Sequence, residues 1–438
     1  MPSAGDFSAT QDNPGVLRAV GRWQLVGLSV NDVIGSGIYL LPAAAAALLG
    51  PASLWAVLLA GVAVSLLVLC FAQAASFYDH RAGGSYLYAR EAFGPLAGFE
   101  VGWMLLLTRI SSAAALSNGL AEAVTHFWPM AATGGVRVAI IVGSLLALTW
   151  INVIGVRAAA RTGVFLAISK LVPLAMFIAI GAFFVDMSQA SPMAVGSIPV
   201  QDLAKGALLL LFAFAGFENM PTAAAEYRNP RRDVPFAMIT MIVTVTLIYV
   251  GVQWVALGTL PGLGESSTPL ADASAQFGGA WLALVLTVGA AISILGTNSN
   301  TIMFGPRYLH ALAEDGYGPK ILTRIHPRYR TPAVAVVVVG VFSTILALSG
   351  SFVQLALLSV VARLVGYVAV SLSVLVLRKR HGGREGAIRL PGGPLIPIAA
   401  TVLSLALLAS AGVYNLAAGA LALLAGVLIY RFWRRPIP

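Results

Sequence analysis

Long apolar runs recur along this chain, and most of them end at charged residues, proline or glycine. A helix that spans the hydrocarbon core of a bilayer needs about 20 mostly apolar residues. Twelve runs fit this requirement, so the pattern predicts an all-α membrane protein with twelve transmembrane helices. We expect them at residues 23–48, 52–77, 96–126, 135–153, 162–185, 203–227, 235–259, 278–304, 333–350, 352–377, 392–410 and 412–431.

The composition supports a multi-pass membrane protein. Of the 438 residues, 58% are hydrophobic and 10% are charged, whereas a soluble domain carries roughly a quarter charged residues. The net charge is +10, but Lys and Arg gather in short loops between apolar runs, so we expect the lipid bilayer and no nucleic acid as a partner. The first 22 residues are polar and the first apolar run can span, so no cleavable signal peptide is expected.

The positive charges also indicate orientation. Most of the 27 Lys and Arg residues lie in the two terminal tails and in every second loop between the predicted helices. Cytoplasmic loops carry such an excess. The pattern therefore predicts both termini in the cytoplasm, an even number of helices and, we expect, a bacterial plasma (inner) membrane.

Two predicted spans contain residues that interrupt a helix. The first span reads DVIGSGI over residues 32–38, and the sixth reads FAFAGFEN over residues 212–219. Glycine lowers helix stability by about 1 kcal/mol relative to alanine, and unwound backbone at membrane depth is tolerated only where it lines a cavity or is buried in protein. Spans one and six occupy corresponding positions in two five-helix halves, and paired breaks of this kind indicate a midplane binding site.

Such breaks suit a zwitterion. Free N–H groups at the start of a half-helix can hold a carboxylate, and free carbonyls at the end of the preceding half-helix can hold an ammonium. An amino acid supplies both charges. The alternative is that the glycines serve only close packing between helices.

Four stretches, in order and at the expected spans, carry a family resemblance. They are GSGI (35–38) with Leu41-Pro42; AGGSYLY (82–88) with Phe93-Gly94 and Gly102-Trp103; FAGFE (214–218) leading to Glu226, Asn229-Pro230, Arg232 and Pro235; and Arg307 with Ala313, Asp315-Gly316, Pro319 and Thr331-Pro332. With them the chain resembles the amino acid–polyamine–organocation (APC) superfamily of permeases, strongly over residues 20–380 and weakly over the last two spans.

The resemblance implies a LeuT-like fold. A cytoplasmic tail (1–22) would precede a ten-helix core (23–377) made of two inverted five-helix repeats, 23–185 and 203–377, and two peripheral helices with a short cytoplasmic tail would follow (392–438). The substrate carboxylate would meet N–H groups around Ser36, Gly37 and Ile38, and its ammonium would meet carbonyls near Val33, Phe212 and Ala215, with Phe212 and Phe214 as a gate. The implied substrate-binding residues are Val33, Gly35, Ser36, Gly37, Ile38, Thr108, Phe212, Phe214, Ala215 and Gly216.

Lys170 lies inside the fifth predicted span. A charge within the bilayer is costly, so it should face protein or water. In sodium-independent relatives that this chain resembles, a span-five lysine stands near where sodium would bind, and its ammonium replaces the cation. A desolvated ammonium there could exchange protons. The alternative is a lysine that snorkels to the cytoplasmic surface.

Four more charges fall within predicted spans: Asp32, Arg109, Glu218 and Arg363. Arg109 could bind an acidic group on the substrate or form an ion pair with Glu218 or Asp32, and we favour the ion pair because unpaired buried charge is costly. Glu218 could be a proton relay or that partner. We expect Arg363 to be structural. Asn298, Ser299 and Asn300 could line the pocket or hydrogen-bond between helices.

Several motifs of other function classes are absent from the sequence. It contains no Gly-x-x-x-x-Gly-Lys-Ser/Thr loop, no His-Glu-x-x-His or Cys cluster, and no Gly-x-Ser-x-Gly. We therefore expect no enzyme, no catalytic residue, no metal and no cofactor.

The function that the sequence predicts is secondary transport of amino acids by alternating access, sodium-independent and coupled to protons in symport. Obligatory exchange of amino acids or amines is the alternative, and a transporter-like amino-acid sensor is a third. Phe212, Phe214 and Ala215 favour neutral amino acids over polyamines. The sequence leaves the particular substrate open, and it leaves a monomer and a homodimer equally open.

Overall fold

The computed structural model describes residues 21–78, 84–154, 159–191, 198–329, 331–381, 387–390 and 392–433, and their regular elements are helices. Each of the twelve segments in which we predicted a span contains helix. The principal helices are α1 (Arg22–Val33), α2 (Ser36–Leu49), α3 (Ser53–Ser76), α5 (Pro95–Ala123), α6 (Gly134–Ile154), α7 (Ala159–Gly181), α9 (Val200–Leu211), α10 (Pro230–Thr259), α11 (Pro269–Glu314), α12 (Ala333–Ala347), α13 (Phe352–His381), α14 (Leu395–Ala409) and α15 (Val413–Trp433).

By length and composition, seven segments of the described chain can cross a membrane. One of them, Ser36–Ser76, contains both α2 and α3, and three further apolar helices are shorter, including α12 and α14. The protein is thus an all-helical membrane protein. Twelve crossings stay a prediction, because the remaining predicted spans are short or interrupted.

Several helix boundaries differ from those that we predicted. A short helix, α4 (Gly84–Phe93), lies in the loop before α5. Helix α11 begins at Pro269 rather than at residue 278, and its backbone kinks at Gly279, where φ is +67°. A left-handed residue of this kind interrupts the helix in a way that hydrophobic periodicity does not reveal.

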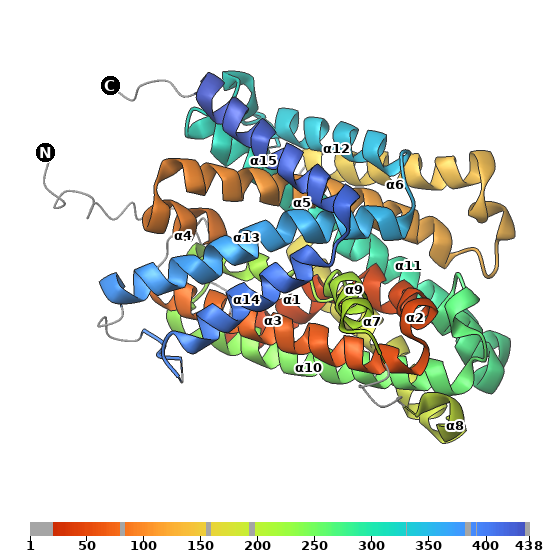
Figure 1. The fold of residues 1–438 in the computed structure, drawn as a ribbon. Coiled ribbons are helices and arrows are strands. Elements are labelled where there is room, and N and C mark those ends of the chain that lie inside the picture. Colours follow the sequence, from red (N-terminus) through yellow and green to blue (C-terminus); the bar gives the residue numbers. More distant parts are fainter. Residues whose placement is uncertain are drawn as a thin grey trace, which may run out of the picture.

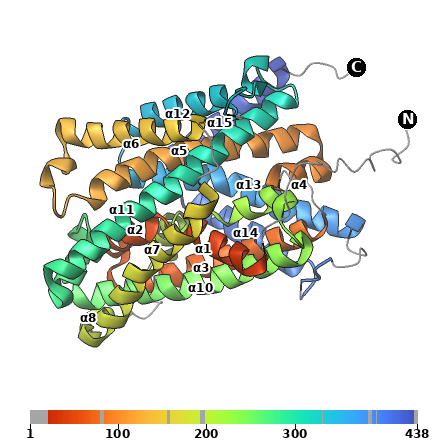
Figure 2. The same cartoon turned by 180° about the vertical axis from the view of Figure 1, so that it is seen from behind.

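The helices pack side by side around a buried centre (Figure 1). Helix α5 packs against both α11 and α13, while α3 packs along α10. The short helices α1 and α2 lie between these groups. The view from behind shows α7 and α11 running across that side of the molecule (Figure 2). The interrupted first span is therefore enclosed by longer helices.

The two interruptions lie against each other at this centre. Helix α1 ends at Val33 and α2 begins at Ser36, while α9 ends at Leu211 and a 3-10 helix, η5 (Phe217–Glu226), follows after a turn. A Cβ on Gly37 would lie 2.5 Å from the Cα of Ala213, and a Cβ on Gly216, where φ is +132°, would lie 2.6 Å from the carbonyl oxygen of Asp32. Glycine is needed at both positions because the two backbones approach so closely.

Candidate functional site

A cavity of about 30 Å³ lies between the two breaks, with room for about one water molecule. An amino acid would enter only after side chains or helices move apart. The cavity is lined by parts of both broken spans and of α5, α11 and α13. Its walls are Asp32, Val33, Gly35, Ser36, Gly37, Arg109, Ser112, Leu116, Phe212, Ala213, Ala215, Gly216, Thr297, Thr301 and Arg363.

Three residues that we assigned to substrate binding do not line this cavity: Ile38, Thr108 and Phe214. Thr108 is buried, and its hydroxyl donates to the Met104 carbonyl within α5 at 2.9 Å. The Phe214 ring is buried and packs on Tyr249, with ring centroids 4.8 Å apart. The Phe214 ring therefore fills a packing space behind the break, and its expected role as a gate stays a prediction. Phe212 does line the cavity.

The start of α2 offers hydrogen-bond donors to the cavity. The first N–H groups of a helix have no partner within the helix, and Ser36 and Gly37 form this end. The Ser36 hydroxyl is buried and has no hydrogen-bond partner among the described residues. These groups, with the positive end of the helix dipole, suit an anion.

One carbonyl expected to hold an ammonium, that of Val33, and the neighbouring carbonyl of Ala213 already lie near a donor. The hydroxyl of Tyr249 donates to the Ala213 carbonyl at 2.7 Å and lies 3.5 Å from the Val33 carbonyl. Tyr249 therefore holds the two breaks together from α10, a contact that the sequence did not predict.

Lys170 is fully buried, and its ammonium faces the break of the first span. Its Nζ donates to the Asn31 carbonyl at 2.9 Å, to the Ile34 carbonyl at 3.0 Å and to the Thr297 hydroxyl at 2.9 Å. Three donors meet three acceptors, so the ammonium is fully bonded. The side chain does not snorkel to the surface, which excludes the alternative that we raised for it.

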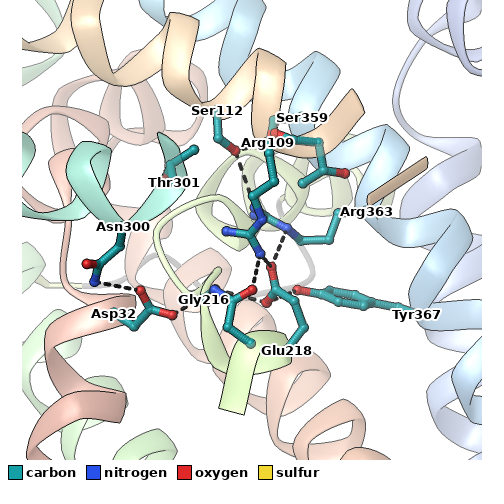
Figure 3. A network of polar contacts seen from close by, with 12 residues as sticks. Asp32, Arg109, Ser112, Gly216, Glu218, Asn300, Thr301, Ser359, Arg363 and Tyr367 are labelled. Atoms are coloured by element: carbon teal, nitrogen blue, oxygen red, sulfur yellow. Dashed lines mark hydrogen bonds and ion pairs between the residues drawn. The ribbon is translucent and has the colours of Figure 1, made fainter. Parts of the chain in front are cut away.

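Arg109 and Glu218 form an ion pair in which Nη2 of the arginine lies 3.0 Å from Oε1 of the glutamate (Figure 3). Arg363 also reaches Oε1, with its Nε at 3.0 Å. The other carboxylate oxygen accepts from the Tyr367 hydroxyl at 3.0 Å and from the Gly216 N–H at 2.9 Å. Glu218 is fully buried. Its single carboxylate is the counter-charge for two guanidinium groups. We expected Arg363 to be structural, yet it also lines the cavity.

Asp32 is held by amides rather than by a guanidinium. Its two oxygens accept from Asn219 at 2.7 Å and from Asn300 at 3.1 Å. Arg109 donates to the amide oxygen of Asn219, so this amide joins the two acidic residues into one network. Asn219 was not among the site residues that we predicted. Its signal was a second polar residue directly after Glu218 in an apolar, interrupted span.

The asparagines of α11 divide between the two uses that we considered. The amide of Asn298 donates to the Ser117 hydroxyl at 2.9 Å and so joins α11 to α5. Asn300 instead reaches Asp32 at the cavity wall (Figure 3). Helical spacing alone does not separate a packing contact from a contact at the site.

Together, the membrane-spanning helices and a charged cavity between two interrupted spans define a membrane transporter. The profile of the family described as amino acid permease matches residues 20–429. The chain belongs to this family, within the APC superfamily, and family membership implies a LeuT-like fold. It is a transporter and not an enzyme.

Curated relatives cover nearly the whole chain. It is 28% identical to the branched-chain amino acid permease BcaP of Bacillus subtilis, over 98% of this chain and 96% of that protein. It is 29% identical to the serine/threonine exchanger SteT of the same organism, over 95% and 96%. The chloroplastic cationic amino acid transporter 9 of Arabidopsis thaliana is 28% identical over 75% of this chain and 61% of that protein. The named substrates differ among these relatives.

Proposed function

We propose that this protein is a sodium-independent secondary transporter that moves amino acids across a bacterial plasma membrane by alternating access, in symport with protons. The observation that carries the proposal is the position of Lys170. Its ammonium bonds to two backbone carbonyls at the break of the first span and to Thr297 of α11. A fixed cation occupies the place among oxygens where a mobile sodium ion would otherwise be needed.

The proton would act on the same nitrogen. The charged ammonium satisfies three acceptors, whereas a neutral amine has only two hydrogens to donate. Loss of the proton therefore weakens the link between the break of α1 and helix α11. A substrate bound at that break contacts the same backbone, so its binding depends on whether Lys170 is protonated. In this way proton movement is coupled to opening of the cavity.

In this proposal the substrate carboxylate meets N–H groups of Ser36 and Gly37, and its ammonium meets carbonyls near Val33, Phe212 and Ala215. Support comes from the free donors at the start of α2 and from the closeness of the two breaks. The wider arrangement that we propose has twelve crossings, two inverted five-helix repeats and both termini in the cytoplasm.

Obligatory exchange is the second candidate, because one relative of similar coverage is named a serine/threonine exchanger. In an exchanger the cavity would reopen only when occupied. Substrate on the far side would then drive uptake in place of a proton gradient.

The test is uptake of a labelled amino-acid panel into sodium-free proteoliposomes. The proteins are wild type, Lys170→Ala and the control Lys205→Ala, whose lysine is half-exposed and pairs with Asp202. Each is measured with and without an inward proton gradient and with and without internal amino acid. We expect gradient-driven uptake that Lys170→Ala loses and Lys205→Ala keeps.

Two results would contradict this proposal. Uptake that requires internal substrate and ignores the gradient would make the protein an exchanger and would remove Lys170 as the coupling residue. Uptake that requires added sodium would exclude the replacement of that ion by the lysine.

A further inference from the structure

Arg109 and Arg363 both line the cavity, and each has a buried nitrogen without a hydrogen-bond partner among the described residues, Nε in Arg109 and Nη1 in Arg363. Arg109 is bonded to Glu218 and to the amide of Asn219. Arg363 makes one short contact, from Nε to Glu218 at 3.0 Å, and a longer one from Nη2 to the Ser112 hydroxyl at 3.3 Å. Its Nη1 has no hydrogen-bond partner among the described residues, although the side chain is only 2% exposed.

An unpartnered guanidinium nitrogen at this depth is a costly feature that a ligand can relieve. Buried donors without acceptors destabilise the folded state, and the planar guanidinium suits a carboxylate better than any other side-chain cation does. Both carboxylates of this site are already engaged. Glu218 is shared with Arg109, and Asp32 is bonded by two amides.

The charges buried around the site also indicate an anionic ligand. While Lys170 holds its proton, three cations (Arg109, Lys170 and Arg363) face two carboxylates (Asp32 and Glu218), which leaves one positive charge in excess among these described residues. A neutral zwitterion does not compensate it, and a cationic substrate would increase it. A substrate with one net negative charge makes the site neutral.

Building on the proposed transport function, we propose that the substrates are dicarboxylic amino acids and that Arg363 binds their side-chain carboxylate. The α-carboxylate lies at the start of α2, where the Ser36 hydroxyl is also unpartnered. The ammonium lies toward Asp32 and the carbonyls of the breaks. Arg363, on α13, faces the cavity from a different helix and supplies the third point of recognition.

The first test uses wild type alone and compares glutamate with glutamine, and aspartate with asparagine, which nearly match in volume. Uptake into proteoliposomes gives KM for each, and binding in detergent gives Kd. We expect the acid of each pair to be favoured by about 10- to 100-fold, the ratio that one or two charge-assisted hydrogen bonds provide. An amide that is taken up as well as its acid would overturn the proposal.

The second test uses Arg363→Met and Arg363→Lys. Removing Arg363 leaves Glu218 bonded to Arg109, Tyr367 and Gly216, so the fold has support without it. We expect Arg363→Met to lose the preference for glutamate while KM for glutamine changes by less than about threefold. Arg363→Lys keeps the charge but not the planar pair of donors, and we expect an intermediate preference.

The matched control is Arg137→Gln. Arg137 also pairs with a partly buried carboxylate, that of Glu122, but it lies outside the cavity. It should keep the wild-type preference. Equal loss of glutamate and glutamine transport in Arg363→Met, with a normal size-exclusion profile, would make Arg363 structural and overturn the proposal.

The outcomes also separate this proposal from the transport function on which it rests. Wild type that carries neutral amino acids and rejects glutamate and aspartate is still a transporter, and only the substrate class is then wrong. Wild type that carries neither class of amino acid refutes the proposed function itself.

Discussion

At the scale of single residues, Glu218 is the most constrained group at the site. It is fully buried and accepts from two arginines, a tyrosine and a backbone N–H. Burying a carboxylate and two guanidinium groups costs several kcal/mol per ion, and only close pairing offsets that cost. The network depends most on its single carboxylate, because both guanidinium groups lose their counter-charge when it is removed.

Glu218→Gln should therefore destabilise the protein strongly. The change keeps the side-chain shape but leaves two buried guanidinium groups without a counter-charge, and we expect the free energy of unfolding to fall by about 3–5 kcal/mol. Reversible unfolding in mixed detergent micelles measures it. The control is Glu122→Gln, whose carboxylate is 25% exposed and pairs with Arg137, so it should cost at most about 1 kcal/mol. Equal losses in the two variants would refute the special role of Glu218.

The sequence identified part of this network and missed the rest for a definite reason. A charge inside an apolar span must find a partner, and this argument pairs Arg109 with an acidic residue. It does not choose between Asp32 and Glu218, because the choice depends on how two broken backbones pack. Arg363 was expected to be structural, and its ion pair with Glu218 agrees with that. Nothing in the sequence of its span shows that α13 also borders the cavity.

At the scale of elements, the two interruptions determine where the site lies. Their positions were readable from glycine, proline and polar residues within apolar runs. Their form was not: the second break continues as the 3-10 helix η5 rather than as an α-helix. Glycine and proline content predicts where a helix is weak, whereas the conformation beyond the break depends on contacts such as Tyr249 with Ala213.

A pair of glycine substitutions tests the contact between the breaks. In Gly37→Ala the new Cβ would lie 2.5 Å from the Cα of Ala213, so the backbones must separate, and we expect a loss of about 1–3 kcal/mol from overpacking together with loss of substrate binding. Gly27 lies in α1 with nothing within 4 Å of its Cβ position. Gly27→Ala should be neutral or gain up to about 1 kcal/mol.

Unfolding in detergent and substrate-induced thermal shift give the two readouts. Normal substrate binding by Gly37→Ala would show that the breaks need not touch for the site to form. A loss of substrate binding in Gly27→Ala would show that alanine disturbs the first span even where it makes no contact with the second break.

At the scale of the whole molecule, the twelve crossings that we propose include helices that are short for a bilayer. Helix α12 has 15 residues and is about 23 Å long, against a hydrocarbon core of about 30 Å. It nevertheless exposes Val337, Val341, Phe342 and Ile345 on its surface. Such a face suits lipid, and a short helix crosses with help from flanking residues or from local thinning of the bilayer.

The orientation that we predict follows from Arg324 and its neighbours before α12, which belong on the cytoplasmic side. Position 349, in the turn after α12, and position 413, at the start of α15, should then face the outside. Cys70 is the only cysteine of the chain and is buried. A Cys70→Ala background therefore contains no cysteine other than the one introduced for labelling. Arg324, Ser349 and Val413 are all exposed and accept a cysteine.

On intact cells, a membrane-impermeant maleimide should label Ser349→Cys and Val413→Cys and should leave Arg324→Cys unlabelled until the membrane is opened. The physical reason is that, in the topology that we propose, α12 and α14 each carry the chain across the bilayer although each has 15 residues. Labelling of positions 324 and 349 from the same side would mean that α12 does not cross. The termini would then lie on opposite sides unless a second short helix also fails to cross, and the five-helix repeats would no longer have matching topology.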